Sequence, residues 1–79
     1  MSDDEILKRL IQILKKSTTK DVSGVDFDSS LRIDLGIESV GMMFMAVLIE
    51  KEFEVSFEGV EFDSFKTVSD VVNFIKAKC

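Results

Sequence analysis

Histidine is absent from this chain of 79 residues, so the protein has neither an imidazole base nor a histidine ligand for a metal. Its four glycines are scattered rather than gathered into a phosphate-binding loop. Cys79 is the one cysteine and has no partner for an internal disulfide, which favours a cytoplasmic protein. Because no base, nucleophile and pocket are indicated together, we do not expect an enzyme.

Long apolar runs are missing as well. No segment is apolar for long enough to span a membrane, and the acidic residues 1–4 lack the apolar core of a signal peptide. A calcium loop could begin at Asp26, but its sixth and twelfth positions hold Leu31 and Ile37 where glycine and glutamate are needed. We therefore predict no metal site and no membrane insertion.

The residues that are present describe a small acidic domain. The net charge of −5 disfavours nucleic acid and anionic lipid as partners and favours docking to basic patches on other proteins. Hydrophobic residues make up 46% of the chain, which is enough for a packed core and argues against disorder. A chain of this length has no room for a second core, so we expect one domain over residues 1–79, acting as a monomer.

Hydrophobic spacing predicts three main helices, over residues 3–17, 39–53 and about 67–76, and one short helix within 60–64. Residues 18–38 form a long connection without a clear period. Its recurring apolar residues are Val22, Val25, Phe27, Leu31, Ile33 and Leu35. Because so long a connection is unusual in a compact domain, we expect it to pack on the core. The predicted fold is all-α, a small four-helix bundle with a long loop between the first and second helices.

The second predicted helix is unusually apolar, because residues 40–49 carry no charge. A domain this small cannot hide a whole helix, so some of these side chains should be exposed. Val40, Phe44 and Val47 share one side at helical spacing. Periodicity alone leaves two interpretations of this strip about equally open, plain core and a docking surface.

Ser39 stands where this helix should begin, after a loop that contains Gly36. A serine there can cap the helix, or it can present its hydroxyl beside backbone N–H groups that favour an anion. From physical chemistry alone the cap is the favoured interpretation. Asp34 and Glu38 place negative charge on either side of this position, which would suit a basic modifying enzyme.

The segment Asp-Leu-Gly-Ile-Glu-Ser-Val at 34–40 resembles the attachment site of acyl carrier proteins, where Asp-Leu-Gly-x-Asp-Ser-Leu is typical. The likeness extends over nearly the whole chain, through Glu-Lys-Glu-Phe at 50–53 and Phe-Lys-Thr-Val at 65–68. It implies that Ser39 carries 4′-phosphopantetheine, taken from coenzyme A. Glu38 and Val40 depart conservatively from the pattern. Phe44 stands where fatty-acid carriers often have an acidic residue, which implies a more hydrophobic partner.

This resemblance implies a stand-alone carrier that holds acyl intermediates as thioesters for fatty-acid or polyketide-type biosynthesis. Its partners would be a phosphopantetheinyl transferase and acyl-activating, condensing and other acyl-processing enzymes. We expect partner recognition to involve Asp34, Glu38, Val40, Phe44 and Val47. A carrier of aminoacyl or peptidyl groups remains an alternative, as does an unmodified helical module that binds a partner through residues 40–47.

Overall fold

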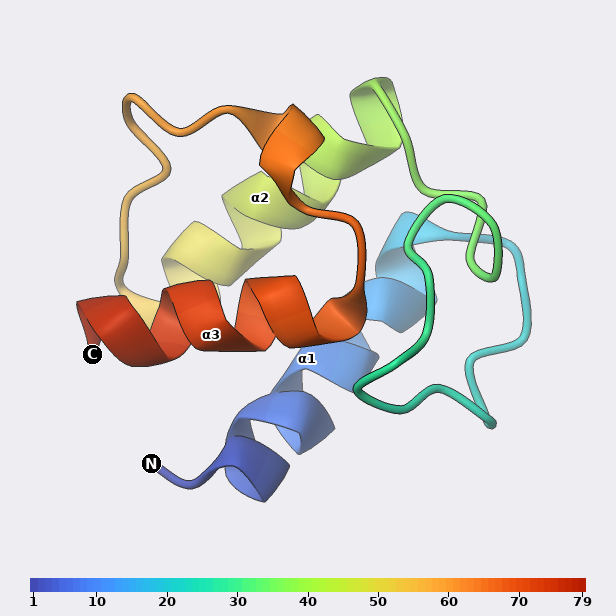
Figure 1. Ribbon diagram of the computed structural model, residues 1–79, viewed down its shortest axis with the longest axis horizontal. Helices are drawn as coiled ribbons and strands as arrows, with labels where there is room; N and C mark the ends of the chain where they lie inside the picture. Colours follow the sequence, from blue (N-terminus) through green and yellow to red (C-terminus); the bar gives the residue numbers. More distant parts are fainter.

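The computed structural model describes residues 1–79 and contains helices but no strand (Figure 1). In chain order, the elements are α1 (Asp3–Ser17), α2 (Val40–Phe53), the single 3₁₀ turn η1 (Phe62–Ser64) and α3 (Val68–Lys78). α1 packs against both α2 and α3. All buried side chains are apolar and form one core. The predicted all-α fold with a long first connection is confirmed.

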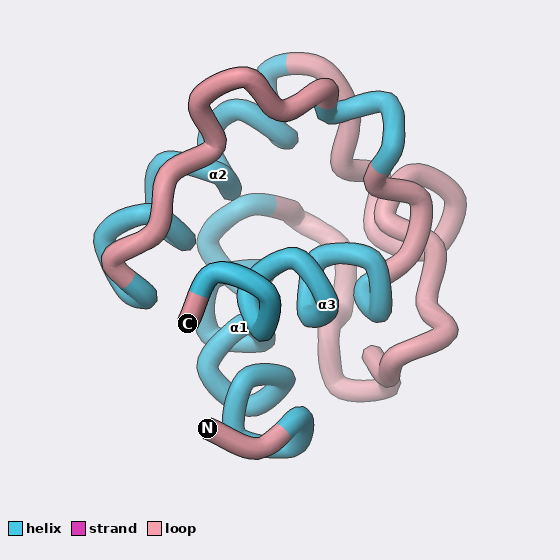
Figure 2. The backbone as a smooth tube through the Cα atoms, turned by 60° about the vertical axis from the view of Figure 1, so that its left-hand side comes forward, coloured by secondary structure: helices cyan, strands magenta, loops and turns pink.

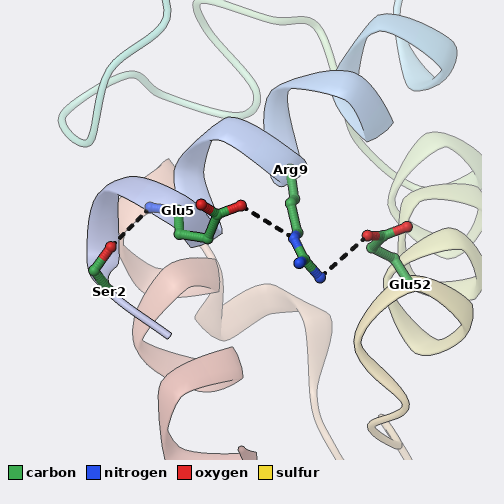
Figure 3. Close-up of polar contacts among 4 residues, drawn as sticks. All are labelled: Ser2, Glu5, Arg9 and Glu52. Atoms are coloured by element: carbon green, nitrogen blue, oxygen red, sulfur yellow. Dashed lines mark hydrogen bonds and ion pairs between the residues drawn. The ribbon is translucent and has the colours of Figure 1, made fainter.

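α1 has the bounds that its apolar spacing predicts, and its start is stabilised by a side-chain cap. The amide of Glu5 donates to Oγ of Ser2 at 3.2 Å. The Glu5 carboxylate does not complete a capping box, and one of its oxygens accepts from Nε of Arg9 at 3.3 Å (Figure 3). The same guanidinium lies 3.5 Å from a carboxylate oxygen of Glu52 and so joins α1 to the end of α2.

The long connection folds onto the core, as its recurring apolar residues predict. In Figure 2 it is the pink tube on the right-hand side, which leads from the end of α1 to the start of α2. The amide of Leu31 donates to the carbonyl of Lys66 at 3.0 Å, and the amide of Val68 donates to the carbonyl of Ser29 at 3.0 Å. These bonds attach the connection to the start of α3 and hold its last part in one place.

The second half of the chain differs from expectation mainly in the extent of its short elements. The expected short helix in 60–64 is the 3₁₀ turn Phe62–Ser64. α3 runs to Lys78, two residues beyond the predicted end.

Thr67 and Asp70 form a full capping box at the start of α3. The phenylalanine rings at 57 and 74 stack with their centroids 4.5 Å apart, joining the loop after α2 to α3.

Candidate functional site

The end of the long connection is a tight turn that leads into α2. The Asp34 carboxylate accepts from the amide of Ser30 at 2.6 Å, and the Gly36 amide donates to the carbonyl of Arg32 at 3.0 Å. Gly36 has φ +65°, a conformation that glycine adopts without steric cost. Leu35 and Ile37 on either side are 0% and 2% exposed. The two buried side chains anchor the turn, so residues 38–40 emerge at a defined place on the surface.

Ser39 is exposed and immediately precedes α2. Its φ of +50° and ψ of −112° are unusual for a residue with a side chain. The carbonyl of Glu38 accepts from the amide of Gly41 at 3.0 Å across this turn, and the Ser39 carbonyl accepts from the amide of Met43 at 3.2 Å. The Ser39 hydroxyl makes no capping hydrogen bond. The capping interpretation is therefore wrong, and the hydroxyl is available to another group.

A free hydroxyl distinguishes Ser39 from most other serines of the chain. Most of the other serines have a hydroxyl that donates or accepts a hydrogen bond. These are Ser2, Ser17, Ser23, Ser29, Ser30, Ser56 and Ser64. Only Ser39 and Ser69 have no side-chain partner, and Ser69 is half-buried whereas Ser39 is exposed. Ser39 is thus the one serine that is both exposed and without a side-chain hydrogen bond.

The first turn of α2 also lacks the acidic residues that the first turns of α1 and α3 contain. α1 has Asp3, Asp4 and Glu5 in its first turn, and α3 has Asp70, whereas α2 has no acidic residue there. Unpaired N–H groups and the helix dipole favour an anion at such a position. A phosphodiester on the Ser39 oxygen would supply that anion, so the residues present fit a phosphate-linked group.

A cleft of about 720 Å³ lies beside Ser39. It is lined by residues of the turn, the first part of α2, η1 and the segment after η1. Its apolar lining residues are Leu31, Ile33, Ile37, Met42, Met43, Phe62 and Phe65. The cleft therefore offers an apolar surface to a group that is attached to Ser39.

Comparison with known proteins identifies the family. A family model described as the phosphopantetheine attachment site matches residues 8–75. The acyl carrier protein of Arthrobacter sp. (strain FB24) is 38% identical over 74 residues, which cover 94% of this chain and 91% of that protein. The chain belongs to the acyl carrier protein family. The acyl carrier proteins of Exiguobacterium sibiricum and Rickettsia bellii (strain RML369-C) agree, at 30% identity over 78 residues and 34% over 73. This chain covers 99% and 85% of their lengths.

Membership in this family has direct consequences. Acyl carrier proteins are non-catalytic carriers, and their cofactor is 4′-phosphopantetheine. The family works with phosphopantetheinyl transferases and acyl-processing enzymes. None of the helices in this carrier is both long and apolar enough to cross a bilayer. The expectations of a carrier and of its cofactor are thus confirmed.

The predicted recognition strip of this acyl carrier protein lies on the surface. The exposed fractions of Val40, Phe44 and Val47 are 78%, 47% and 49%. The interpretation of these residues as core is therefore wrong. The opposite face of α2 supplies the core instead, through Met42, Met45, Ala46, Ile49 and Phe53.

The two predicted acidic recognition residues already have partners. Both residues are exposed, but the Asp34 carboxylate accepts a hydrogen bond from the Ser30 amide. Oε2 of Glu38 lies 3.6 Å from Nε of Arg32. Negative charge flanks Ser39 as expected, although it is partly balanced by this guanidinium.

Ile33, Met43 and Arg32 lie near Ser39 but are not among the recognition residues that the sequence predicts. Ile33 and Met43 line the cleft and are 77% and 60% exposed. Arg32 lines the same cleft through its long side chain. Ile33 resembles the buried apolar residues of the connection by type and spacing, so only its place in the turn distinguishes it. Arg32 carries no motif that marks it.

Proposed function

We propose that Ser39 is the residue of this carrier that receives 4′-phosphopantetheine. The observation that carries the proposal is its exposed hydroxyl, which has no hydrogen-bond partner and stands at a helix start without a side-chain cap. The backbone N–H groups and the dipole of α2 would stabilise the phosphodiester. When bound, the group supplies a flexible arm that ends in a thiol and carries an acyl chain as a thioester.

We further propose that residues 1–79 act as one carrier domain for fatty-acid or polyketide-type biosynthesis in the cytoplasm. The single carrier domain is supported by the chain's coverage of most of the length of relatives that are themselves acyl carrier proteins. An aminoacyl or peptidyl carrier is the alternative within the same family. Incubating the modified protein with acyl-activating and amino-acid-activating enzymes and measuring the mass of the thioester would distinguish the two.

Partner enzymes dock, in this proposal, on a surface formed by Val40, Phe44 and Val47, with Asp34 and Glu38 beside it. The exposed large apolar side chains support it. Apart from Met1, all of them lie on α2 or in the turn beside Ser39; they are Ile33, Val40, Met43, Phe44 and Val47. Apolar area exposed next to an attachment point favours contact with a partner of matching apolar surface.

Intact mass spectrometry after incubation with coenzyme A and a phosphopantetheinyl transferase tests the attachment. We expect the native protein to gain the mass of one phosphopantetheine and the Ser39→Ala variant to gain none. Ser69→Ala is the matched control, because Ser69 also lacks a side-chain partner. This control should gain the group as the native protein does. A folded native protein that gains no mass would favour the rival function, an unmodified helical interaction module.

A further inference from the structure

Arg32 lies beside the proposed attachment residue, and its guanidinium has one exposed partner. Nε of Arg32 is 3.6 Å from Oε2 of Glu38, the residue that precedes Ser39. The Arg32 and Glu38 side chains are 77% and 64% exposed, so water and salt screen their attraction. The guanidinium is therefore free to exchange this partner for a stronger one.

Attachment of the cofactor would bring a stronger partner to this place. A phosphodiester on Ser39 adds a negative charge next to the Glu38 carboxylate, and the two anions repel each other. Arg32 is a cation already present at this place, because it contacts Glu38 and lines the same cleft as Ser39. Its planar guanidinium can donate two parallel hydrogen bonds to phosphate oxygens.

The second cation of the cleft, Lys66, is less suited to this role. Lys66 also lines the cleft, and its backbone carbonyl accepts from the amide of Leu31 at 3.0 Å. Its ammonium group is a compact point charge and lacks the planar pair of donors that a guanidinium offers to a phosphate. Arg32 pairs with the residue next to Ser39, and its planar guanidinium can offer two parallel donors to a phosphate.

We infer that Arg32 binds the phosphodiester on Ser39 in the modified protein and releases Glu38. This rests on the proposed function, because it requires Ser39 to carry the group. Arg32 would then be a positioning residue that fixes the first atoms of the arm at the mouth of the cleft. The Glu38 carboxylate would then be free to contact a partner in the modified protein, whereas it is paired with Arg32 in the unmodified protein.

Nuclear magnetic resonance of the whole protein, before and after modification, tests this. Intact mass first establishes that one group has been added. The side-chain Nε–H signal of Arg32 is then compared between the two forms, with Arg9, the only other arginine, as internal reference. The ³¹P signal of the phosphodiester is recorded for the native protein, Arg32→Ala and the matched control Lys66→Ala.

We expect modification to shift the Arg32 Nε–H signal and to leave the Arg9 signal in place. The ³¹P signal should shift in Arg32→Ala relative to the native protein and stay unchanged in Lys66→Ala. An Arg32 signal that is identical in both forms would overturn the inference while leaving the attachment site intact. So would equal ³¹P shifts in the two variants, since these would indicate a general loss of positive charge. Failure to gain the group at all would instead overturn the proposed function, and this inference with it.

Discussion

The carbonyl oxygen of Ser39 accepts a hydrogen bond from the amide of Met43 at 3.2 Å, whereas the Ser39 hydroxyl caps nothing. The residue thus begins α2 with its backbone alone. At the start of α3 the side chain contributes as well, because the amide of Asp70 donates to the Thr67 carbonyl at 3.1 Å and to the Thr67 hydroxyl at 3.3 Å. One helix start is stabilised by its side chain, and the other leaves its side chain free for use.

This difference predicts unequal effects of removing the two hydroxyls. Thr67→Ala should lower the free energy of unfolding by about 1 kcal/mol, the usual loss for a helix cap. Ser39→Ala should change it by less than about 0.5 kcal/mol, as for an exposed residue without a structural role. Urea denaturation of both variants measures this. A loss in Ser39→Ala as large as that in Thr67→Ala would mean that the serine caps α2 after all.

The turn before Ser39 should depend on Gly36 in particular. Its φ of +65° is strained for any residue with a Cβ, so Gly36→Ala should destabilise the protein by about 1–2 kcal/mol. Because this turn positions Ser39, transfer of phosphopantetheine should also slow. Gly24→Ala is the matched control, since a Cβ at Gly24 meets no atom within 4 Å. Equal stability of the two variants would contradict this role of the turn.

Docking through the exposed strip of α2 predicts a strong effect at Phe44. Phe44→Glu should lower kcat/KM of a cognate acyl-transferring enzyme by about tenfold or more, equivalent to about 1.4 kcal/mol of lost binding. Ala77→Glu makes the same change of charge at an exposed position of α3 and should have little effect. Thermal melting establishes that both variants are folded. Unchanged acyl transfer by Phe44→Glu would remove the strip from the docking surface.

Acid should weaken the start of α3. The hydrogen bond from the backbone amide of Lys66, followed in size by that from the amide of Thr67, holds the pKa of Asp70 below its usual value. Burial acts in the opposite direction. A lowered folded pKa means that this carboxylate stabilises the fold fully above about pH 4, its unfolded pKa, and that the contribution disappears as the pH falls through the folded pKa.

Comparing the native protein with Asp70→Asn isolates this contribution. The native protein should be the more stable of the two at neutral pH, and the difference should shrink as the pH falls below about 4. Urea denaturation at a series of pH values measures both. A difference that is independent of pH would show that the charge of Asp70 has no part in the cap.

Much of this architecture could be predicted because local signals agree with the tertiary structure. The apolar spacing of residues 3–17 and the Thr67–Asp70 cap each specify a helix without help from distant residues. The turn before α2 is different. Ile33, Leu35 and Ile37 have equivalent spacing and similar side chains, yet Ile33 is 77% exposed and the other two are buried. Which of them faces the core depends on bonds from the connection to the start of α3, and sequence spacing does not contain that information.

The candidate site, too, was predictable from the sequence only in part. The resemblance of residues 34–40 to a known motif was sufficient to select Ser39 and to lead to the family. Whether its hydroxyl is a cap or is free depends on the backbone angles of the turn, which serine does not favour and which no motif specifies. The pairing of Arg32 with Glu38 likewise arises only when the turn brings residues six positions apart together.

The most direct test of the central claim is to locate the added group. The folded native protein is incubated with coenzyme A and a phosphopantetheinyl transferase, digested, and sequenced by tandem mass spectrometry. We expect one phosphopantetheine, on Ser39 and on no other serine or threonine. A group found on another residue, or none on Ser39 in folded protein exposed to a competent transferase, would contradict the account.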